Sequence, residues 1–281
     1  MTSYSKIDQP EVIALLFPPQ KSSATPCPAD AEDVSFDISS TVALKCRYYS
    51  SSREGAVLFL YPATESSFQS FDLLAENYVN RGVNVFIASY RGCGMNQGMP
   101  SVEAAFEDSE KLFRLAVDWL RLKGCTGPCF VMGQSLGSIY AIDTVFKNGD
   151  SVKGLIIESG ICGTADYLKA SGASPEQAEI LEADGFNTIE KIEKIKVPTL
   201  IFHGAKDPLV AVTEAEKLQA SSGARTKQFF VMPGAERLTV SEKGGDLYLQ
   251  TIKQFMDTVS GVNTWRQKRK SYRTNQKDPK V

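Results

Sequence analysis

The sequence predicts an α/β fold with a mostly parallel central sheet and helices on both faces. Its 281 residues, 42% hydrophobic and 23% charged, are those of an ordinary globular protein long enough for one large domain. Short apolar runs alternate along the chain with segments whose apolar residues recur every three or four positions. The runs are apolar or β-branched nearly throughout, as strands buried on both faces of a parallel sheet are.

The expected elements follow in chain order. Residues 34–38 and 42–49 alternate between apolar and polar side chains and are bounded by Ser-rich turns, which is typical of an antiparallel pair. Buried parallel strands are expected at 56–61, 83–89, 129–132, 152–158, 199–203 and 227–232. Helices with one apolar face are expected at 71–81, 102–123, 136–147, 213–221 and 247–259.

One stretch breaks this alternation. Residues 163–196, rich in Glu, Lys and Ala, are expected to form a largely helical insertion at the carboxyl edge of the sheet, where an insertion covers the pocket or simply packs. The expected organisation is an irregular N-terminal arm (1–32), an α/β domain (33–260) that contains this lid, and a basic C-terminal tail (261–281).

Charge is distributed unevenly along the chain. After Val262, seven Lys and Arg stand against one Asp, so a formal total of −2 leaves about eight net negative charges on the rest. A solvated end is the simplest interpretation of such a tail, with contact to nucleic acid or an anionic membrane as a minor alternative. No apolar run approaches the roughly 20 residues of a membrane span, and residues 12–17 lack the basic lead of a signal peptide. We therefore expect a cytoplasmic protein.

Cysteine and histidine usage indicates no metal site. The six cysteines lack the paired spacing of zinc ligands, and one histidine cannot complete a mixed site. We expect structural thiols and no cofactor, with a disulfide between Cys125 and Cys129 left open.

The most informative motif is Gly133-Gln134-Ser135-Leu136-Gly137, between an expected strand and an expected helix. A Gly-x-Ser-x-Gly sequence in this context is typical of a sharp turn that lifts a serine hydroxyl off the sheet edge. The backbone at the serine is strained, and side chains at Gly133 or Gly137 would collide with neighbouring elements. The amide of Leu136 then points at the oxygen of an attacked carbonyl. Ser135 is therefore a candidate nucleophile.

Two further signatures, together with this turn, resemble the α/β-hydrolase family. Tyr90-Arg91-Gly92-Cys93-Gly94 is similar to its Tyr-Arg-Gly-x-Gly turn, and the run from His203 to Val210 is similar to its His-Gly-x-x-Asp-x-x-Val. The resemblance covers about Asp33 to Val259 and is strongest to the small intracellular esterase, thioesterase and serine-peptidase-like branch. It implies an α/β-hydrolase fold with a small helical lid.

The resemblance also implies roles for individual residues. Ser135 is the nucleophile, Asp207 is the acid of the triad, and the amides of Leu136 and Ala63 are the oxyanion donors. Before Ala63 stands Pro62, which has no amide hydrogen. A plain turn at the end of the strand is the alternative interpretation of this loop.

The catalytic histidine that the resemblance implies is missing. Its expected place, after the last strand, is Met232-Pro233-Gly234-Ala235-Glu236-Arg237-Leu238, with Arg237 at the histidine position. Arginine, with a pKa above ~12, neither takes the serine proton nor returns it to a leaving group. In one well-studied serine protease, losing the histidine costs roughly a million-fold in turnover, on the order of 8 kcal/mol.

Other residues are weaker candidates for the base. His203 belongs to a turn in which the family's histidine is structural, and only a reorganised site would bring it to Ser135. Glu236 is a second candidate, because burial raises the pKa of a carboxylate. For Arg237 itself, we expect either a bidentate ion pair with Asp207 or an anionic ligand such as a carboxylate or phosphate.

Two functions therefore follow from the sequence. The first is a serine hydrolase of small acyl esters or thioesters whose activity is strongly reduced because the histidine is absent. The second is an inactive pseudo-hydrolase that binds a ligand or a partner. They differ only in whether Ser135 is activated. Apolar lid residues such as Tyr167 and Phe186 favour an acyl chain over a sugar, or hold the lid down.

Overall fold

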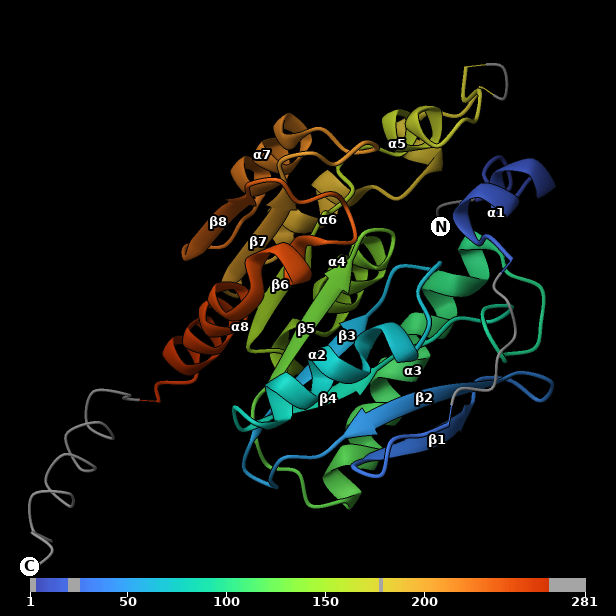
Figure 1. Ribbon diagram of the computed structural model, residues 1–281. Coiled ribbons are helices and arrows are strands. Elements are labelled where there is room, and N and C mark those ends of the chain that lie inside the picture. Colours follow the sequence, from blue (N-terminus) through green and yellow to red (C-terminus); the bar gives the residue numbers. More distant parts are fainter. Residues whose placement is uncertain (1–3, 20–25, 177–178, 263–281) are drawn as a thin grey trace, which may run out of the picture.

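Eight strands form one sheet at the centre of the molecule (Figure 1). The structure is a computed structural model that describes residues 4–19, 26–176 and 179–262. The strands are β1 (Ala31–Asp37), β2 (Ala43–Tyr49), β3 (Ala56–Tyr61), β4 (Val83–Ile87), β5 (Cys129–Gln134), β6 (Gly154–Glu158), β7 (Thr199–Gly204) and β8 (Lys227–Met232).

The strands lie in the order β1-β2-β4-β3-β5-β6-β7-β8. The β1–β2 and β2–β4 pairs are antiparallel, and every pair from β4–β3 to β7–β8 is parallel. The predicted antiparallel opening and the mostly parallel sheet are confirmed. Ligands of open parallel sheets bind outside the carboxyl ends of the strands, and this edge carries the residues discussed below.

The α-helices are α1 (Pro10–Leu16), α2 (Gln69–Val79), α3 (Val102–Leu122), α4 (Gly137–Asn148), α5 (Thr164–Ala170), α6 (Thr188–Lys194), α7 (Val212–Ser221) and α8 (Val240–Val259). Four of the five helices for which the sequence predicts a range match that range to within two residues. The start of α8 differs, because its first turns contain Gly244 and Gly245 and mostly polar residues, so they show no apolar period. The helix bends at Gly245, whose φ is 49°.

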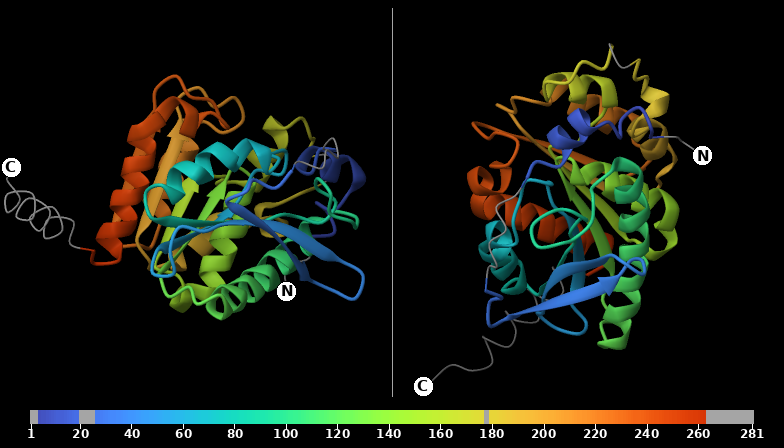
Figure 2. Two further views of the ribbon diagram at one scale, coloured as in Figure 1. Left: turned by 60° about the horizontal axis from the view of Figure 1, so that its bottom comes forward. Right: turned by 90° about the vertical axis from the view of Figure 1, so that its right-hand side faces the viewer.

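The helices cover both faces of the sheet (Figure 2). Helices α2 and α8 pack on one face, where Tyr78 and Tyr248 are completely or almost completely buried. Helices α3 and α4 pack on the other face, where Phe113 and Tyr140 are likewise almost or completely buried. Two apolar layers thus enclose the strands, which holds the loops at their carboxyl ends on a rigid frame.

The lid is less helical than expected. Only α5 and α6 are α-helical, with a single 3-10 turn at Glu182–Asp184 between them in the residues that the structure describes. Gly172 (φ 97°) and Asn187 (φ 52°) take left-handed backbone conformations, which end or delay a helix. The lid is held instead by Glu182, whose carboxylate accepts from the amide and hydroxyl of Thr164 at 2.6 and 3.0 Å.

The N-terminal arm is more ordered than expected, because it contains α1. Pro10 stands in the first turn of this helix, where its missing amide hydrogen costs nothing. Lys6 pairs with Asp184 of the lid at 3.0 Å, and the carbonyl of Leu16 accepts from the Thr64 hydroxyl at 2.5 Å. The arm therefore ties the lid to the loop that follows β3.

The turn between β5 and α4 is packed too closely for side chains at its glycines. A Cβ at Gly133 would lie 2.5 Å from the Cα of Ser138, and one at Gly137 would lie 2.2 Å from the carbonyl oxygen of Tyr61. These contacts are to backbone, so neither neighbour can move aside cheaply. The β3, β5 and α4 backbones are therefore locked together at this turn.

We predict that Gly137→Ala lowers the free energy of unfolding by at least about 2 kcal/mol, because the new methyl group clashes with Tyr61. Urea denaturation measures the change. The matched control is Gly149→Ala at the other end of α4, where nothing lies within 4 Å and the backbone is helical. Equal stabilities of the two variants would contradict the close approach.

Candidate active site

Ser135 lies at the apex of the turn between β5 and α4. Its φ of 51° is in the left-handed region that a non-glycine residue rarely adopts, and its side chain is completely buried. Its amide donates to the carbonyl of Glu158, at the end of β6, at 2.8 Å. The turn therefore fixes the serine backbone in the strained conformation that the motif predicts.

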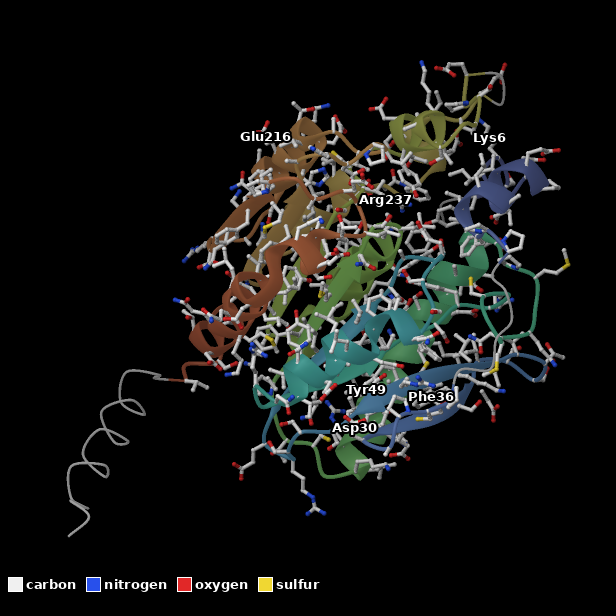
Figure 3. The ribbon with its side chains drawn as sticks, in the orientation of Figure 1. Lys6, Asp30, Phe36, Tyr49, Glu216 and Arg237 are labelled. Atoms are coloured by element: carbon white, nitrogen blue, oxygen red, sulfur yellow. The ribbon has the colours of Figure 1, made fainter. Side chains whose placement is uncertain are left out.

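Arg237 reaches this serine from the loop between β8 and α8. Its Nη1 donates to the Ser135 Oγ at 2.5 Å, and its Nη2 forms an ion pair with the Oε1 of Glu65. The guanidinium lies at the carboxyl edge of the sheet, below the lid helix α5 (Figure 3). Glu65 belongs to the loop after β3. Three loops thus meet in one chain of hydrogen bonds from Glu65 through Arg237 to Ser135.

The loop of Arg237 is anchored by its backbone. The Ala235 carbonyl accepts from the amide of Lys206 at 2.8 Å, and the Glu236 amide donates to the Thr239 hydroxyl at 2.9 Å. The loop therefore packs against the one that carries Asp207, and its short turn directs Arg237 toward Ser135. Glu236 itself is exposed.

The ion pair expected between Arg237 and Asp207 does not form, and that prediction is wrong. Asp207 Oδ1 accepts the amides of Leu209 and Val210, both at 3.0 Å, so it holds its own turn. Its Oδ2 is buried and has no hydrogen-bond partner among the described residues. The guanidinium of Arg237 forms its ion pair with Glu65 instead. An orphaned carboxylate oxygen is left where the superfamily pattern expects a histidine partner.

His203 is the next-to-last residue of β7 and is completely buried. Its Nε2 donates to the carbonyl of Val210 at 2.9 Å and lies 3.8 Å from the Oδ2 of Asp207, and its Nδ1 has no partner among the described residues. It makes no hydrogen bond to Ser135. This geometry favours the structural role over that of a base.

Tyr167, from the lid helix α5, lies beside the serine and the guanidinium. Burial raises the pKa of its phenol, and this outweighs the opposing effects of Arg237 and of the Ser135 hydroxyl. The phenol therefore stays protonated at neutral pH. Of the side chains that contact or adjoin Ser135, the arginine is a cation and the tyrosine is neutral, so neither takes a proton from its hydroxyl.

The expected oxyanion donors are at suitable elements. Leu136 stands at the N-cap of α4, and Ala63 is buried in the loop that follows β3. That loop is fixed by the Tyr90 hydroxyl, which donates to the Pro62 carbonyl at 2.8 Å, and by the Ser66 amide, which donates to Ala63 at 3.0 Å. The roles of Leu136 and Ala63 as donors remain a proposal.

A buried carboxylate lies beneath the turn, on the side of α2 and α8. Glu158 is completely buried, and its two oxygens accept from Gln134 Nε2 at 2.7 Å and from the Tyr248 hydroxyl at 2.5 Å. Burial raises the pKa of this carboxyl despite both donors. Gln134 precedes Ser135, so this cluster supports the turn from below.

Comparison with known proteins agrees with this geometry. The family described as serine aminopeptidase, S33, matches residues 52–184. The chain is 30% identical over 190 residues to the alpha/beta hydrolase domain-containing protein WAV2 of Arabidopsis thaliana, covering 62% of this chain and 60% of that protein. It is 30% identical over 193 residues to protein bem46 of Schizosaccharomyces pombe, covering 66% and 62%. The chain thus spans less than two thirds of the length of these relatives.

Solved structures share the fold. The Pyrococcus furiosus esterase Pf2001 superposes with a TM-score of 0.67 at 17% identity, over 81% of this chain and 92% of that one. A soluble variant of the monoglyceride lipase of Saccharomyces cerevisiae gives 0.66 at 15% identity, over 87% and 98%. The chain therefore has the α/β-hydrolase fold.

Two residues of this site were not predicted as such. Glu65 was missed, although it follows Ala63 by two positions in the loop expected to hold an oxyanion donor. A lone carboxylate in that loop was the available signal. Tyr167 was noted only as an apolar lid residue, and its contact with the site depends on how the lid folds back.

The described part of the chain shows no metal cluster and no disulfide. No group of three or more His, Cys, Asp and Glu side chains in it is placed to hold a metal ion, and all six cysteines are free. None of its helices is both long and apolar enough to cross a membrane. The basic tail after Val262 lies outside the described residues.

We predict that Glu158 makes the protein less stable as pH rises. Its folded-state pKa is raised, so above the ordinary value of 4.5 the unfolded chain releases this proton while the folded protein keeps it. The free energy of unfolding therefore falls as pH increases from about 4.5 toward the raised pKa. Urea denaturation across this range should show a smaller fall for Glu158→Gln than for the native protein. Identical pH dependences would contradict the assignment.

Proposed function

We propose that this α/β hydrolase holds Ser135 in an inactive state and acts as a ligand-binding protein, with hydrolysis of small acyl esters or thioesters strongly reduced. The observation that carries the proposal is the hydrogen bond of 2.5 Å from Arg237 Nη1 to the Ser135 Oγ. That oxygen is the atom that would attack a carbonyl carbon.

The chemistry of this bond opposes nucleophilic attack. The guanidinium engages one of the two lone pairs of this oxygen, which lowers its nucleophilicity, and it accepts no proton in exchange. A nearby cation does favour an alkoxide, but the hydroxyl proton still requires an acceptor. The leaving group also requires a donor, which a guanidinium with a pKa above ~12 does not provide.

Retention of the strained turn supports a preserved pocket. The left-handed φ of Ser135 costs of order 1–3 kcal/mol and persists because the surrounding backbone holds it. The site also keeps the buried side chain of Asp207 and the loops of both expected oxyanion donors. These features support a site that still admits a small molecule while lacking the group that would activate the serine.

Weak serine hydrolysis is the second candidate function, favoured by the same intact turn. It requires a base that approaches Ser135 when substrate binds. Neither His203, which bonds to Val210, nor the exposed Glu236 contacts the serine in this structure. An ester or thioester would then be cleaved slowly, with Ser135 as the nucleophile.

We predict that the native protein hydrolyses a short p-nitrophenyl ester at a rate within about tenfold of Ser135→Ala, because the serine is not activated. Arg237→His should exceed both by at least about tenfold. An imidazole there supplies a base, and the orphaned Oδ2 of Asp207 is available to orient it. The initial rate of p-nitrophenol release is the measurement.

The matched control is Arg237→Gln, which frees Ser135 from the guanidinium without supplying a base. It should show no gain over the native protein. A native rate far above that of Ser135→Ala would overturn the proposal in favour of the hydrolase.

A further inference from the structure

A pocket of about 600 Å³ lies against the Glu65 and Arg237 pair on the side of α2 and α8. We call it the serine-lined pocket, and its lining residues are Pro18, Pro19, Glu65, Ser66, Ser67, Ser70, Phe71, Leu74, Gln134, Leu238 and Ser241. Its volume is in the range of small-molecule sites. It includes Gln134, the neighbour of Ser135, so a ligand here would lie close to the serine that Arg237 contacts.

One buried acceptor of this pocket has no partner. Gln134 is 5% exposed, its Nε2 donates to Glu158, and its Oε1 has no hydrogen bond in the part of the chain described. The amide cannot turn round to satisfy the oxygen, because the nitrogen must face the Glu158 carboxylate. A buried acceptor left alone costs about 1–3 kcal/mol. Because this oxygen is enclosed by protein, a ligand hydroxyl would recover this energy only by displacing part of the pocket lining.

The charges around the pocket favour a neutral ligand. Among the described residues of the lining, Glu65 is the one with an ionisable side chain, and it is already paired with Arg237. An anion entering the pocket would meet the Glu65 carboxylate first. A cation beside Glu65 would be repelled by the guanidinium that shares it. Either ion would also lose its hydration without gaining a free counter-charge.

The remaining lining residues fit hydroxyl groups attached to a carbon chain. Serine hydroxyls come from the loop after β3, from the first turn of α2 and from the first turn of α8. Each hydroxyl both donates and accepts, as a ligand hydroxyl does. Apolar contact is offered beside them by Phe71, Leu74 and Leu238.

We propose that the serine-lined pocket binds an uncharged ligand with neighbouring hydroxyl groups next to a short apolar part. The ligand hydroxyls bond to the serines, and one of them reaches Gln134 Oε1 as the lining moves aside. The apolar part packs on Phe71 and Leu238. This inference rests on the proposed function, since it takes the pocket beside the inactive serine as the binding site. It is an alternative to the anionic ligand expected near Arg237, which stays a prediction.

The test compares three probes with the same six-carbon chain: 1,2-hexanediol, hexanoate and hexylammonium. Ligand-detected NMR on the full-length protein gives their relative affinities. We expect the diol to bind at least about tenfold more tightly than either ion. None of the probes contains an ester, so their binding is independent of whether Ser135 hydrolyses anything.

The location is tested with Leu238→Trp, which fills the pocket and should abolish diol binding. Leu247→Trp is the matched control, because Leu247 is 65% exposed on α8 and does not line the pocket. Tighter binding of hexanoate would show that Arg237 engages an anion, and tighter binding of hexylammonium that Glu65 engages a cation. Either result would overturn the proposal. It would also be overturned if the diol did not bind, or if Leu238→Trp and Leu247→Trp changed diol binding equally.

Discussion

The hydrogen bond between Arg237 and Ser135 is the interaction on which the proposed function depends, because it joins the candidate nucleophile to the residue at the histidine position. Ser135 is presented by a turn that the whole sheet supports, while Arg237 comes from a loop more than a hundred residues later. Glu65 fixes the other end of the guanidinium from a third loop. The site thus has a series of charge-assisted hydrogen bonds from Glu65 through Arg237 to Ser135, where a catalytic triad would pass a proton from the serine to a histidine.

The surrounding structure keeps this chain in place by two different means. Below it, backbone contacts at Gly133 and Gly137 leave the turn no freedom, and the Glu158 cluster holds the adjacent Gln134. Above it, the lid brings Tyr167 over the serine, and the N-terminal arm ties the lid to the loop of Glu65. The same packing that would organise a catalytic site holds Ser135 against Arg237 here.

Most of the fold was predictable because its signals are local. Apolar runs predicted the strands, and the predicted bounds of β3 and β8 are those of the structure. The glycine pattern predicted the turn at Ser135. The lid was overestimated as helical, because Glu, Lys and Ala favour helices while Gly172 and Asn187 interrupt them. The partner of Arg237 was missed because it depends on tertiary geometry. Sequence alone could not show that the Oδ1 of Asp207 is committed to the amides of its own turn, or that Glu65 lies opposite.

The reactivity of Ser135 toward a fluorophosphonate tests this account most directly, because the reagent reports whether the hydroxyl is activated without depending on a substrate. The adduct is detected by intact mass and located by peptide mapping. The account predicts that the native protein remains unlabelled under conditions that fully modify an active serine esterase. Stoichiometric modification of Ser135 in the native protein would show that Arg237 does not hold the serine inactive, and would contradict the central claim.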